Sequence, residues 1–281
     1  MQQTVSLLKK DFLRLSDFIN REYGIKMPPV KKTLLESRLQ KRLRKLELGT
    51  FQEYCNYLFS AQGLQNEIPH FINKITTNKT DFFREPDHFD YLVQYAVPEL
   101  IRSGVVSQKE LEIWSAGCSS GEEPYTLGMV IDHYYDQHPN LKTGFSVLGT
   151  DISLEVLKTA QRAVYHEMRI APVPMGMRKK YLLRSKSRDK EVIKIAPELR
   201  RQIRFEQLNF MDKEFGFKKS FDIIFCRNVI IYFDKPTQEE ILNRLCRHLV
   251  KGGYFFQGHS ESIQGMSLPL KAVSPTIYRK C

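Results

Sequence analysis

The chain has 281 residues, of which 42% are hydrophobic and 27% charged, and its formal net charge is +11. This is ordinary globular composition for one large domain plus a smaller one, and no apolar run approaches the roughly 18 to 20 residues that cross a bilayer. The N-terminus lacks the apolar core of a signal peptide, so we expect a cytoplasmic protein without membrane insertion; the positive charge indicates an acidic partner, either nucleic acid, an anionic membrane surface or an acidic protein.

The first 75 residues predict a small all-helical domain. Apolar side chains at helical spacing predict a helix over Leu7–Tyr23, a second from about Pro29 to Leu48, and two shorter helices near 51–60 and 64–75. This quarter of the chain holds over half of the excess positive charge. In the second helix the basic side chains share a face beside the leucine face, which makes them either a solvated surface or a docking surface. These residues are Lys31, Arg38, Lys41, Arg42 and Lys45.

Residues 76–281 predict an α/β domain that opens with a loop. The segment Thr76–Arg84 has no clean period and mixes hydroxyl, amide, aromatic and arginine side chains, which is typical of a functional loop. A linker between the domains is the alternative. A helix over Tyr91–Ser103 then leads into an apolar strand that begins at Leu111.

The stretch LEIWSAGCSSGEEPY at 111–125 combines this strand, a turn of small residues and the start of a helix. Small side chains let a ligand approach the backbone, but Glu122 and Glu123 would repel a polyphosphate, so a cationic or hydroxyl-bearing ligand is expected. The next strand, Gly144–Thr150, ends at Asp151, where doubly wound folds place an acid on ribose hydroxyls. A positively charged nucleoside such as S-adenosylmethionine fits both acids; alternatively, Asp151 only caps the following helix.

Helices to about His138 and over Ser153–Val164 give the order β, α, β, α, which predicts a parallel sheet with right-handed crossovers. From about 166 to 202 the pattern loosens. Two short strands at 181–184 and 191–195 predict an inserted hairpin, which is either an interaction site or a mobile surface loop.

The sheet resumes with strands at 203–208 and 221–226, and polar residues follow both. Because parallel strands end at the same edge of a sheet, these residues should line one crevice together with the small-residue loop and Asp151. A helix over 236–249 and strands at 254–257 and 276–279 complete the domain. The polar residues are Asn209, Arg227 and Asn228.

The five cysteines have no paired spacing, so neither a zinc site nor a disulfide framework is indicated and no metal is expected. Among the seven histidines, only His259 lies near a strand end assigned to the crevice, and we expect it to pack or hydrogen-bond locally.

Four stretches together resemble the CheR-type chemotaxis receptor methyltransferases. They are TTNKTDFFR at 76–84, IWSAGCSSGEEPYTL at 113–127, FDIIFCRNVIIYF at 221–233 and GGYFFQGHSES at 252–262. The basic N-terminal helices are similar too, so the resemblance covers nearly the whole chain. It implies a Rossmann-like class I S-adenosylmethionine-dependent methyltransferase sheet, a helical N-terminal domain (1–75), and a methyltransferase domain (76–281) with an inserted antiparallel β subdomain at about 166–202.

The resemblance implies transfer of a methyl group from S-adenosylmethionine to glutamate side chains on the cytoplasmic helices of chemoreceptors, in sensory adaptation, with S-adenosylhomocysteine as the other product. It places Arg84 and Tyr232 near the methyl transfer, the basic helix face against the receptor, and a C-terminal receptor peptide at the β subdomain. The enzyme would be cytoplasmic and recruited to membrane-bound receptors. The implied cofactor contacts are Asn78, Thr80, Arg84, Glu123, Asp151, Asn209, Phe210, Arg227 and Asn228.

The residues agree with this chemistry, because a glutamate with a reference pKa of about 4.3 is already a carboxylate nucleophile at pH 7 and needs no general base. Two other functions stay open. A nucleic-acid methyltransferase would use the basic helices on phosphates, but no aromatic platform interleaves with them, and NVIIY at 228–232 lacks the proline-rich turn expected for a flipped base. A noncatalytic adaptor would need a damaged site, whereas Glu123, Asp151 and Asn228 are present. We expect a monomer.

Overall fold

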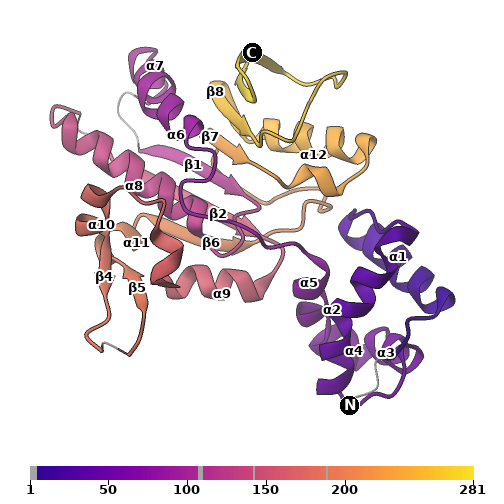
Figure 1. Cartoon of the computed structure of the whole chain (residues 1–281). Helices are drawn as coiled ribbons and strands as arrows, with labels where there is room; N and C mark the ends of the chain where they lie inside the picture. Colours follow the sequence, from indigo (N-terminus) through magenta and orange to yellow (C-terminus); the bar gives the residue numbers. More distant parts are fainter. Residues whose placement is uncertain (1–4, 107–109, 142, 188) are drawn as a thin grey trace.

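The computed structural model describes residues 5–106, 110–141, 143–187 and 189–281. Figure 1 shows a helical N-terminal domain, in indigo and purple, beside a larger domain built on a sheet. The apolar faces of the N-terminal helices pack into a core of their own around Leu15, Phe18 and Phe71, as the helical spacing predicts. The elements are α1 (Lys9–Tyr23), a 3-10 turn (Pro29–Lys31), α2 (Lys32–Lys45), α3 (Phe51–Leu58), α4 (Ala61–Asn66) and α5 (Ile68–Ile75).

Local sequence signals set the ends of these helices. α1 ends at Gly24 with φ of 67°, a left-handed conformation that glycine adopts without a Cβ clash. Thr50 and Ser60 cap α3 and α4 by accepting a backbone N–H. The single helix predicted over 64–75 is two helices, because Pro69 has no N–H with which to continue the first. Among the described residues, no helix is both long and apolar enough to span a bilayer.

A buried ion pair joins α2 to the start of α5. Arg42 donates from Nε to Glu67 Oε1 at 2.8 Å and from Nη2 to Oε2 at 2.5 Å, and the Tyr54 hydroxyl donates to Oε1 at 2.9 Å. The Arg42 and Glu67 side chains are only 8% and 1% exposed. The prediction that Arg42 belongs to a docking surface is therefore wrong: its side chain is buried, and its charge is paired with Glu67 inside the domain.

The other basic residues of this surface differ in their exposure and in their hydrogen bonds. Arg38 donates from Nη1 to the backbone carbonyls of Ile75 and Thr76, at 2.9 and 3.2 Å, so it satisfies the C-terminal end of α5. Lys41 and Lys45 are exposed, and Lys31 is partly buried. The basic surface thus consists of fewer residues than the helical pattern indicates.

We expect Glu67→Ala to destabilise the protein by about 3–5 kcal/mol, because it leaves the Arg42 guanidinium buried without a counter-charge. Urea unfolding followed by circular dichroism measures the loss. The matched control is Glu53→Ala, which removes an exposed carboxylate of the same domain that accepts the Gly49 N–H. A loss below about 1 kcal/mol for Glu67→Ala would contradict the role given to the pair.

The large sheet of the described chain has the strand order β6-β2-β1-β7-β8-β10-β9. Its first five strands are parallel, and β10 pairs antiparallel with both β8 and β9. The chain passes from one side of β1 to the other between β6 and β7, which places a switch point at the carboxyl ends of β1 and β7. The predicted α/β class is confirmed. The strands are β1 (Leu111–Ala116), β2 (Phe145–Asp151), β6 (Ile203–Gln207), β7 (Phe221–Cys226), β8 (Leu249–Gln257), β9 (Leu270–Ser274) and β10 (Ile277–Lys280).

Helices cover both faces of this sheet, because successive side chains of a strand point to opposite faces. Ile113 and Phe225 share one core with α7 and α8, whereas Trp114 and Ile224 share another with α12. The helix predicted over 91–103 begins earlier and passes through a π-helical turn, where Pro98 cannot donate to the ladder. The helices are α6 (Asp87–Tyr91), the π turn (Leu92–Ala96), α7 (Val97–Arg102), α8 (Glu122–Gln137), α9 (Leu154–Arg162) and α12 (Lys235–Arg247).

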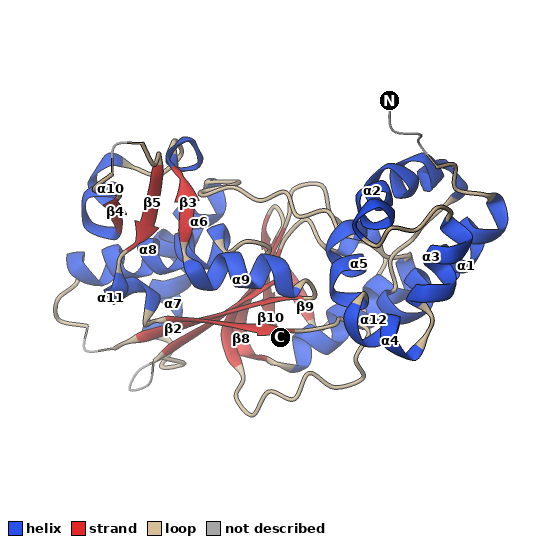
Figure 2. Ribbon diagram, turned by 90° about the horizontal axis from the view of Figure 1, so that it is seen from below, coloured by secondary structure: helices blue, strands red, loops and turns tan. Residues whose placement is uncertain are grey.

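A second, three-stranded antiparallel sheet of order β3-β5-β4 forms the inserted subdomain, which stands apart from the large sheet in Figure 2. The predicted hairpin corresponds to β4 and β5. β3 has only three residues, too few to show an alternating pattern, so the subdomain sheet begins slightly earlier than expected. Its elements are β3 (Val164–His166), a 3-10 turn (Glu167–Ile170), α10 (Met175–Tyr181), β4 (Leu182–Arg184), β5 (Val192–Ile195) and α11 (Pro197–Arg200).

Candidate active site

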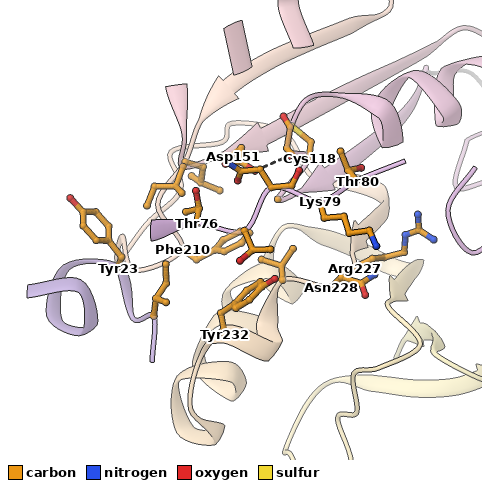
Figure 3. Close-up of a pocket in the computed structure, with 18 of the residues that line it drawn as sticks. Tyr23, Thr76, Lys79, Thr80, Cys118, Asp151, Phe210, Arg227, Asn228 and Tyr232 are labelled. Carbon is orange, nitrogen blue, oxygen red and sulfur yellow. Dashed lines mark hydrogen bonds between the residues drawn. The ribbon is translucent and has the colours of Figure 1, made fainter. Parts of the chain in front are cut away.

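A cleft lies at the carboxyl ends of β1, β2, β6 and β7, where the two domains meet. Figure 3 shows side chains from these strand ends and from the loop at 76–84 turned toward it. All ten residues that the sequence predicts for cofactor binding or catalysis line this one cleft: Asn78, Thr80, Arg84, Glu123, Asp151, Asn209, Phe210, Arg227, Asn228 and Tyr232.

The loop after β1 brings bare backbone to the cleft. Gly117 has φ of 82°, and a Cβ added to it would lie 2.5 Å from Val229 Cγ2, so only glycine fits. Asp151 anchors the next turn: its Oδ2 accepts the Ser119 N–H and its Oδ1 the Ser153 N–H, both at 2.9 Å. Burial raises the pKa of Asp151, against the opposing effect of these backbone hydrogen bonds. Asp151 therefore ties the loop after β1 to the turn before α9 and borders the cleft; the N-cap residue of α9 is Ser153, and no side chain caps that helix in the described structure.

Glu123 is held from two sides. Ser115 Oγ donates to its Oε1 and Arg227 Nε donates to its Oε2, each at 2.7 Å. The Arg227 side chain is 2% exposed, lies over the rings of Phe89 and Phe225, and donates from Nη1 to the backbone carbonyl of Arg84 at 2.8 Å. Arg227 thus ties the carboxyl end of β7 to the loop at 76–84, while Glu123 keeps a negative charge at the mouth of α8.

Arg84 reaches across the cleft edge. It donates from Nη2 to Asn228 Oδ1 at 2.7 Å and from Nη1 to the backbone carbonyl of Lys79 at 3.2 Å. Phe83, Glu85 and Asn228 have φ of 54°, 57° and 60°, in the left-handed region that residues other than glycine rarely occupy. Such strain is common where a fold fixes functional groups.

The remaining predicted residues form the floor and far wall of the cleft. Asn78 donates to Asn73 Oδ1 at 3.2 Å, and its carbonyl accepts from Ser119 Oγ at 3.0 Å. Asn209 donates to the backbone carbonyl of Glu22 at 2.9 Å, and Phe210 is buried against Phe215 and Phe233. Within the described part of the chain, the Tyr232 hydroxyl has no hydrogen-bond partner, and Figure 3 places its ring inside the cleft.

The N-terminal domain completes the cleft, which the sequence pattern does not reveal. Tyr23 and Ile25, from the turn after α1, line it. The Lys26 N–H donates to the carbonyl of Tyr232 at 2.8 Å, and a Cβ on Gly24 would lie 2.5 Å from Met211 Sδ. This turn therefore packs directly on the strand ends of the larger domain.

Glu261 is a further site residue that sequence reasoning missed. Its Oε1 accepts the N–H groups of Val229 and Ile230, and its Oε2 those of Asn228 and Gly258, at 2.8–2.9 Å. Burial raises the pKa of this carboxyl, although the four backbone donors act in the opposite direction. Its position in the HSES run of the stretch at 252–262 was the available signal.

We expect Glu261→Gln to destabilise the protein by about 2–6 kcal/mol. The amide group offers one acceptor oxygen, so two of the four buried N–H groups lose their acceptor, at about 1–3 kcal/mol each. Thermal unfolding and titration with S-adenosylhomocysteine measure stability and cleft integrity on the same samples. Gln264→Glu, a reverse exchange in the exposed part of the same loop, is the control. Wild-type stability in Glu261→Gln would show that the carboxylate does not organise the turn at 228–230.

Glu85, His88 and His259 bring potential metal-ligand atoms within 4.8 Å of one another. However, Arg227 Nη1 lies 3.0 Å from His88 Nδ1 and 3.3 Å from Glu85 Oε2. Burial and this guanidinium lower the pKa of His88 to about 4. Because the positive guanidinium would repel a metal cation at this position, we interpret these side chains as contacts that hold Arg227 in place.

Comparison with known proteins agrees with this geometry. Residues 78–279 match the family model "CheR methyltransferase, SAM binding domain", and residues 10–76 match "CheR methyltransferase, all-alpha domain". The chain is 39% identical to the chemotaxis protein methyltransferase of Borreliella burgdorferi over 98% of its length and 96% of that protein. It is 36% identical to chemotaxis protein methyltransferase 2 of Pseudomonas aeruginosa, over 96% and 92%. With that of Escherichia coli K12 it shares 34% identity, over 99% and 92%.

Both halves of the chain and the shared cleft lead to the same assignment, and the relatives match over nearly their full lengths. The chain belongs to the CheR family of S-adenosylmethionine-dependent chemotaxis methyltransferases.

Proposed function

We propose that the protein transfers a methyl group to glutamate side chains on the cytoplasmic helices of chemoreceptors, forming γ-methyl esters in sensory adaptation. The observation that carries the proposal is the cleft. It lies at the carboxyl edge of the parallel strands, where open α/β sheets bind ligands, and it contains Arg84 and a Tyr232 hydroxyl that has no hydrogen-bond partner among the described residues. No histidine of the described residues lines it, which suits a substrate that needs no general base, because glutamate is already ionised at neutral pH.

The cofactor-binding half of the proposal assigns acids and amides of the cleft to S-adenosylmethionine, which would supply the methyl group. Asp151 would accept hydrogen bonds from the ribose hydroxyls, since its oxygens retain lone pairs beside the two backbone bonds. Glu123 would face the positively charged part of the cofactor. The other residues proposed to contact it are Asn78, Thr80, Arg84, Asn209, Phe210, Arg227 and Asn228.

The catalytic half assigns orientation to Arg84 and Tyr232. A carboxylate oxygen must lie in line with the methyl group, and positioning of this kind supplies much of the acceleration of a displacement. Because the reaction removes charge from both partners, the apolar ring of Phe210 would favour it by keeping water out. Arg84 is already shared between Asn228 and Lys79, so its contact with the substrate would orient the carboxylate without neutralising it fully.

The receptor-facing surface would be the exposed part of α2. Lys41 and Lys45 offer free charges, Lys31 lies near the start of the helix, and Arg38 is held at the end of α5. An acidic helical surface that carries the substrate glutamates is the partner that this charge favours. The inserted subdomain would hold a C-terminal receptor peptide. We propose a cytoplasmic monomer that is recruited to membrane-bound receptors.

The test is transfer of radiolabelled methyl from S-adenosylmethionine to membranes that contain the host's chemoreceptors, followed by mild alkali. We expect label on the receptor band that alkali releases as methanol, which identifies a carboxyl ester. Membranes without chemoreceptors and the host's nucleic acids are the parallel substrates. Label that enters nucleic acid, or that resists alkali on the receptor, would contradict the proposal.

A further inference from the structure

The inserted subdomain touches two segments that line the cleft, although it lies outside the cleft. Tyr165, in β3, donates its hydroxyl to the carbonyl of Ser120 at 2.7 Å. Its ring packs edge-to-face on Phe82, with centroids 5.1 Å apart. A Cβ on Gly121 would lie 3.0 Å from the same hydroxyl. The subdomain therefore contacts both the loop after β1 and the loop at 76–84.

Arg169, in the 3-10 turn that follows β3, makes a polar connection between the loop at 76–84 and the start of α8. Its Nη2 donates to the backbone carbonyl of Thr80 and to Glu122 Oε1, each at 2.5 Å. The Glu122 side chain is 1% exposed, and its Oε2 accepts from Ser120 Oγ at 2.7 Å. Burial raises the pKa of Glu122, which Ser120 and the Arg169 charge partly offset.

The loop at 76–84 depends on such outside contacts because it has no regular secondary structure to hold it. Other ties hold its two ends: Arg38 donates to the Thr76 carbonyl and Asn78 to Asn73, while Thr126 accepts the Phe83 N–H and Arg227 donates to the Arg84 carbonyl. In its middle, Ser119 donates to the Asn78 carbonyl, and Arg169 Nη2 also lies 3.8 Å from Asp81 Oδ1. Among the described residues, the Thr80 carbonyl, at the edge of the cleft, accepts a hydrogen bond only from Arg169. Loss of the Arg169 guanidinium therefore removes this hydrogen bond and the Asp81 ion pair together.

We infer that Arg169 is a positioning residue, through which the inserted subdomain sets the affinity of the cleft for its cofactor. This inference rests on the proposed cofactor site. One guanidinium group holds the Thr80 carbonyl and the start of α8 at a fixed separation, so both walls of the cofactor site are already in place before the ligand arrives. Preorganisation of this kind raises affinity because less ordering remains to be done on binding.

The experiment compares Arg169→Met with Arg178→Met in the full-length protein. Arg178 belongs to the same subdomain and also donates to two backbone carbonyls, those of Val173 and Ala171, but it contacts neither cleft segment. Titration calorimetry with S-adenosylhomocysteine should give a Kd at least tenfold higher for Arg169→Met and within twofold of wild type for Arg178→Met. Arg169→Lys keeps the positive charge but lacks the planar guanidinium fork, so its Kd should fall between those of the other two variants.

A double variant separates the positioning of Thr80 from the effect of leaving the buried Glu122 carboxylate without its counter-charge. In Arg169→Met with Glu122→Gln, no unpaired charge remains, so the melting temperature should return toward that of wild type. If Arg169 positions Thr80, the Kd stays at least tenfold raised. A Kd that returns to the wild-type value in this double variant, or an Arg169→Met Kd within twofold of wild type, overturns the inference.

The outcome also separates this inference from the proposed site. Asp151→Asn, measured in parallel, should lose affinity whether or not Arg169 matters. A weakened Asp151→Asn together with an unchanged Arg169→Met overturns the positioning role alone. Unchanged binding in Asp151→Asn overturns the cofactor site, and this inference with it.

Discussion

Asp151→Asn is expected to weaken binding of S-adenosylmethionine by about 100-fold or more. The carboxylate accepts N–H groups of Ser119 and Ser153 on its two oxygens, so an amide must turn its NH₂ group toward one of these donors. The variant also loses a charged acceptor for the ribose hydroxyls. Hydrogen bonds to charged groups contribute about 1.5–3 kcal/mol each, and each 1.4 kcal/mol corresponds to about tenfold in affinity. Titration calorimetry measures the change directly.

The matched control is Asp234→Asn. Asp234 also accepts a backbone N–H at the start of a helix, that of Thr237 at 2.9 Å, but it does not line the cleft. Since asparagine is an equally good N-cap residue, the control should fold and bind the cofactor as wild type does. An Asp151→Asn protein that binds within threefold of wild type would remove this residue from the cofactor site.

Arg84→Ala is expected to lower kcat for receptor methylation by about 100-fold, the loss typical of a reacting group displaced by about 1 Å. The guanidinium joins Asn228 to the Lys79 carbonyl across the edge of the cleft, so its removal frees both sides of this edge. Single-turnover methylation, in which the enzyme is in excess over receptor, isolates this step from product release. Tyr232→Phe, which removes only a hydroxyl, should have a smaller effect of about tenfold.

Cofactor affinity is the internal control for both variants. Because Arg84 is also proposed to contact the cofactor, calorimetry with S-adenosylhomocysteine must accompany the rates, and the comparison is made at saturating cofactor. Arg84→Lys keeps the charge but lacks the planar fork that spans Asn228 and the Lys79 carbonyl, so it should recover only part of the rate. Full turnover in Arg84→Ala at saturating cofactor would exclude the orienting role.

The sheet and the cleft could be predicted because their signals are local. Buried parallel strands appear as short apolar runs, and the residue after each run must lie at one common edge. Asp151, Asn209 and Arg227 were placed by this rule alone, without knowledge of strand order. The four family stretches added Asn78, Thr80 and Tyr232, whose neighbourhoods have no periodic pattern.

What could not be predicted depends on contacts between distant segments. Arg42 lies on the basic face of its helix, but Glu67, 25 residues later, draws it into the core. Glu261 stabilises a turn 31–33 residues before it through backbone N–H groups, which no residue pattern encodes. β3 and β9, which the sequence did not predict, are edge strands with one neighbour each in the described sheets.

The turn after α1 couples the evolution of the two domains. Tyr23 and Ile25 form part of the cleft wall, and backbone bonds at Glu22 and Lys26 fasten the turn to Asn209 and Tyr232. A recombination event that exchanged only the methyltransferase domain would replace one side of this domain interface and leave the cleft open to solvent. Lineages that alter the turn must therefore change the strand ends that face it at the same time, so the two halves should show correlated substitution across this seam.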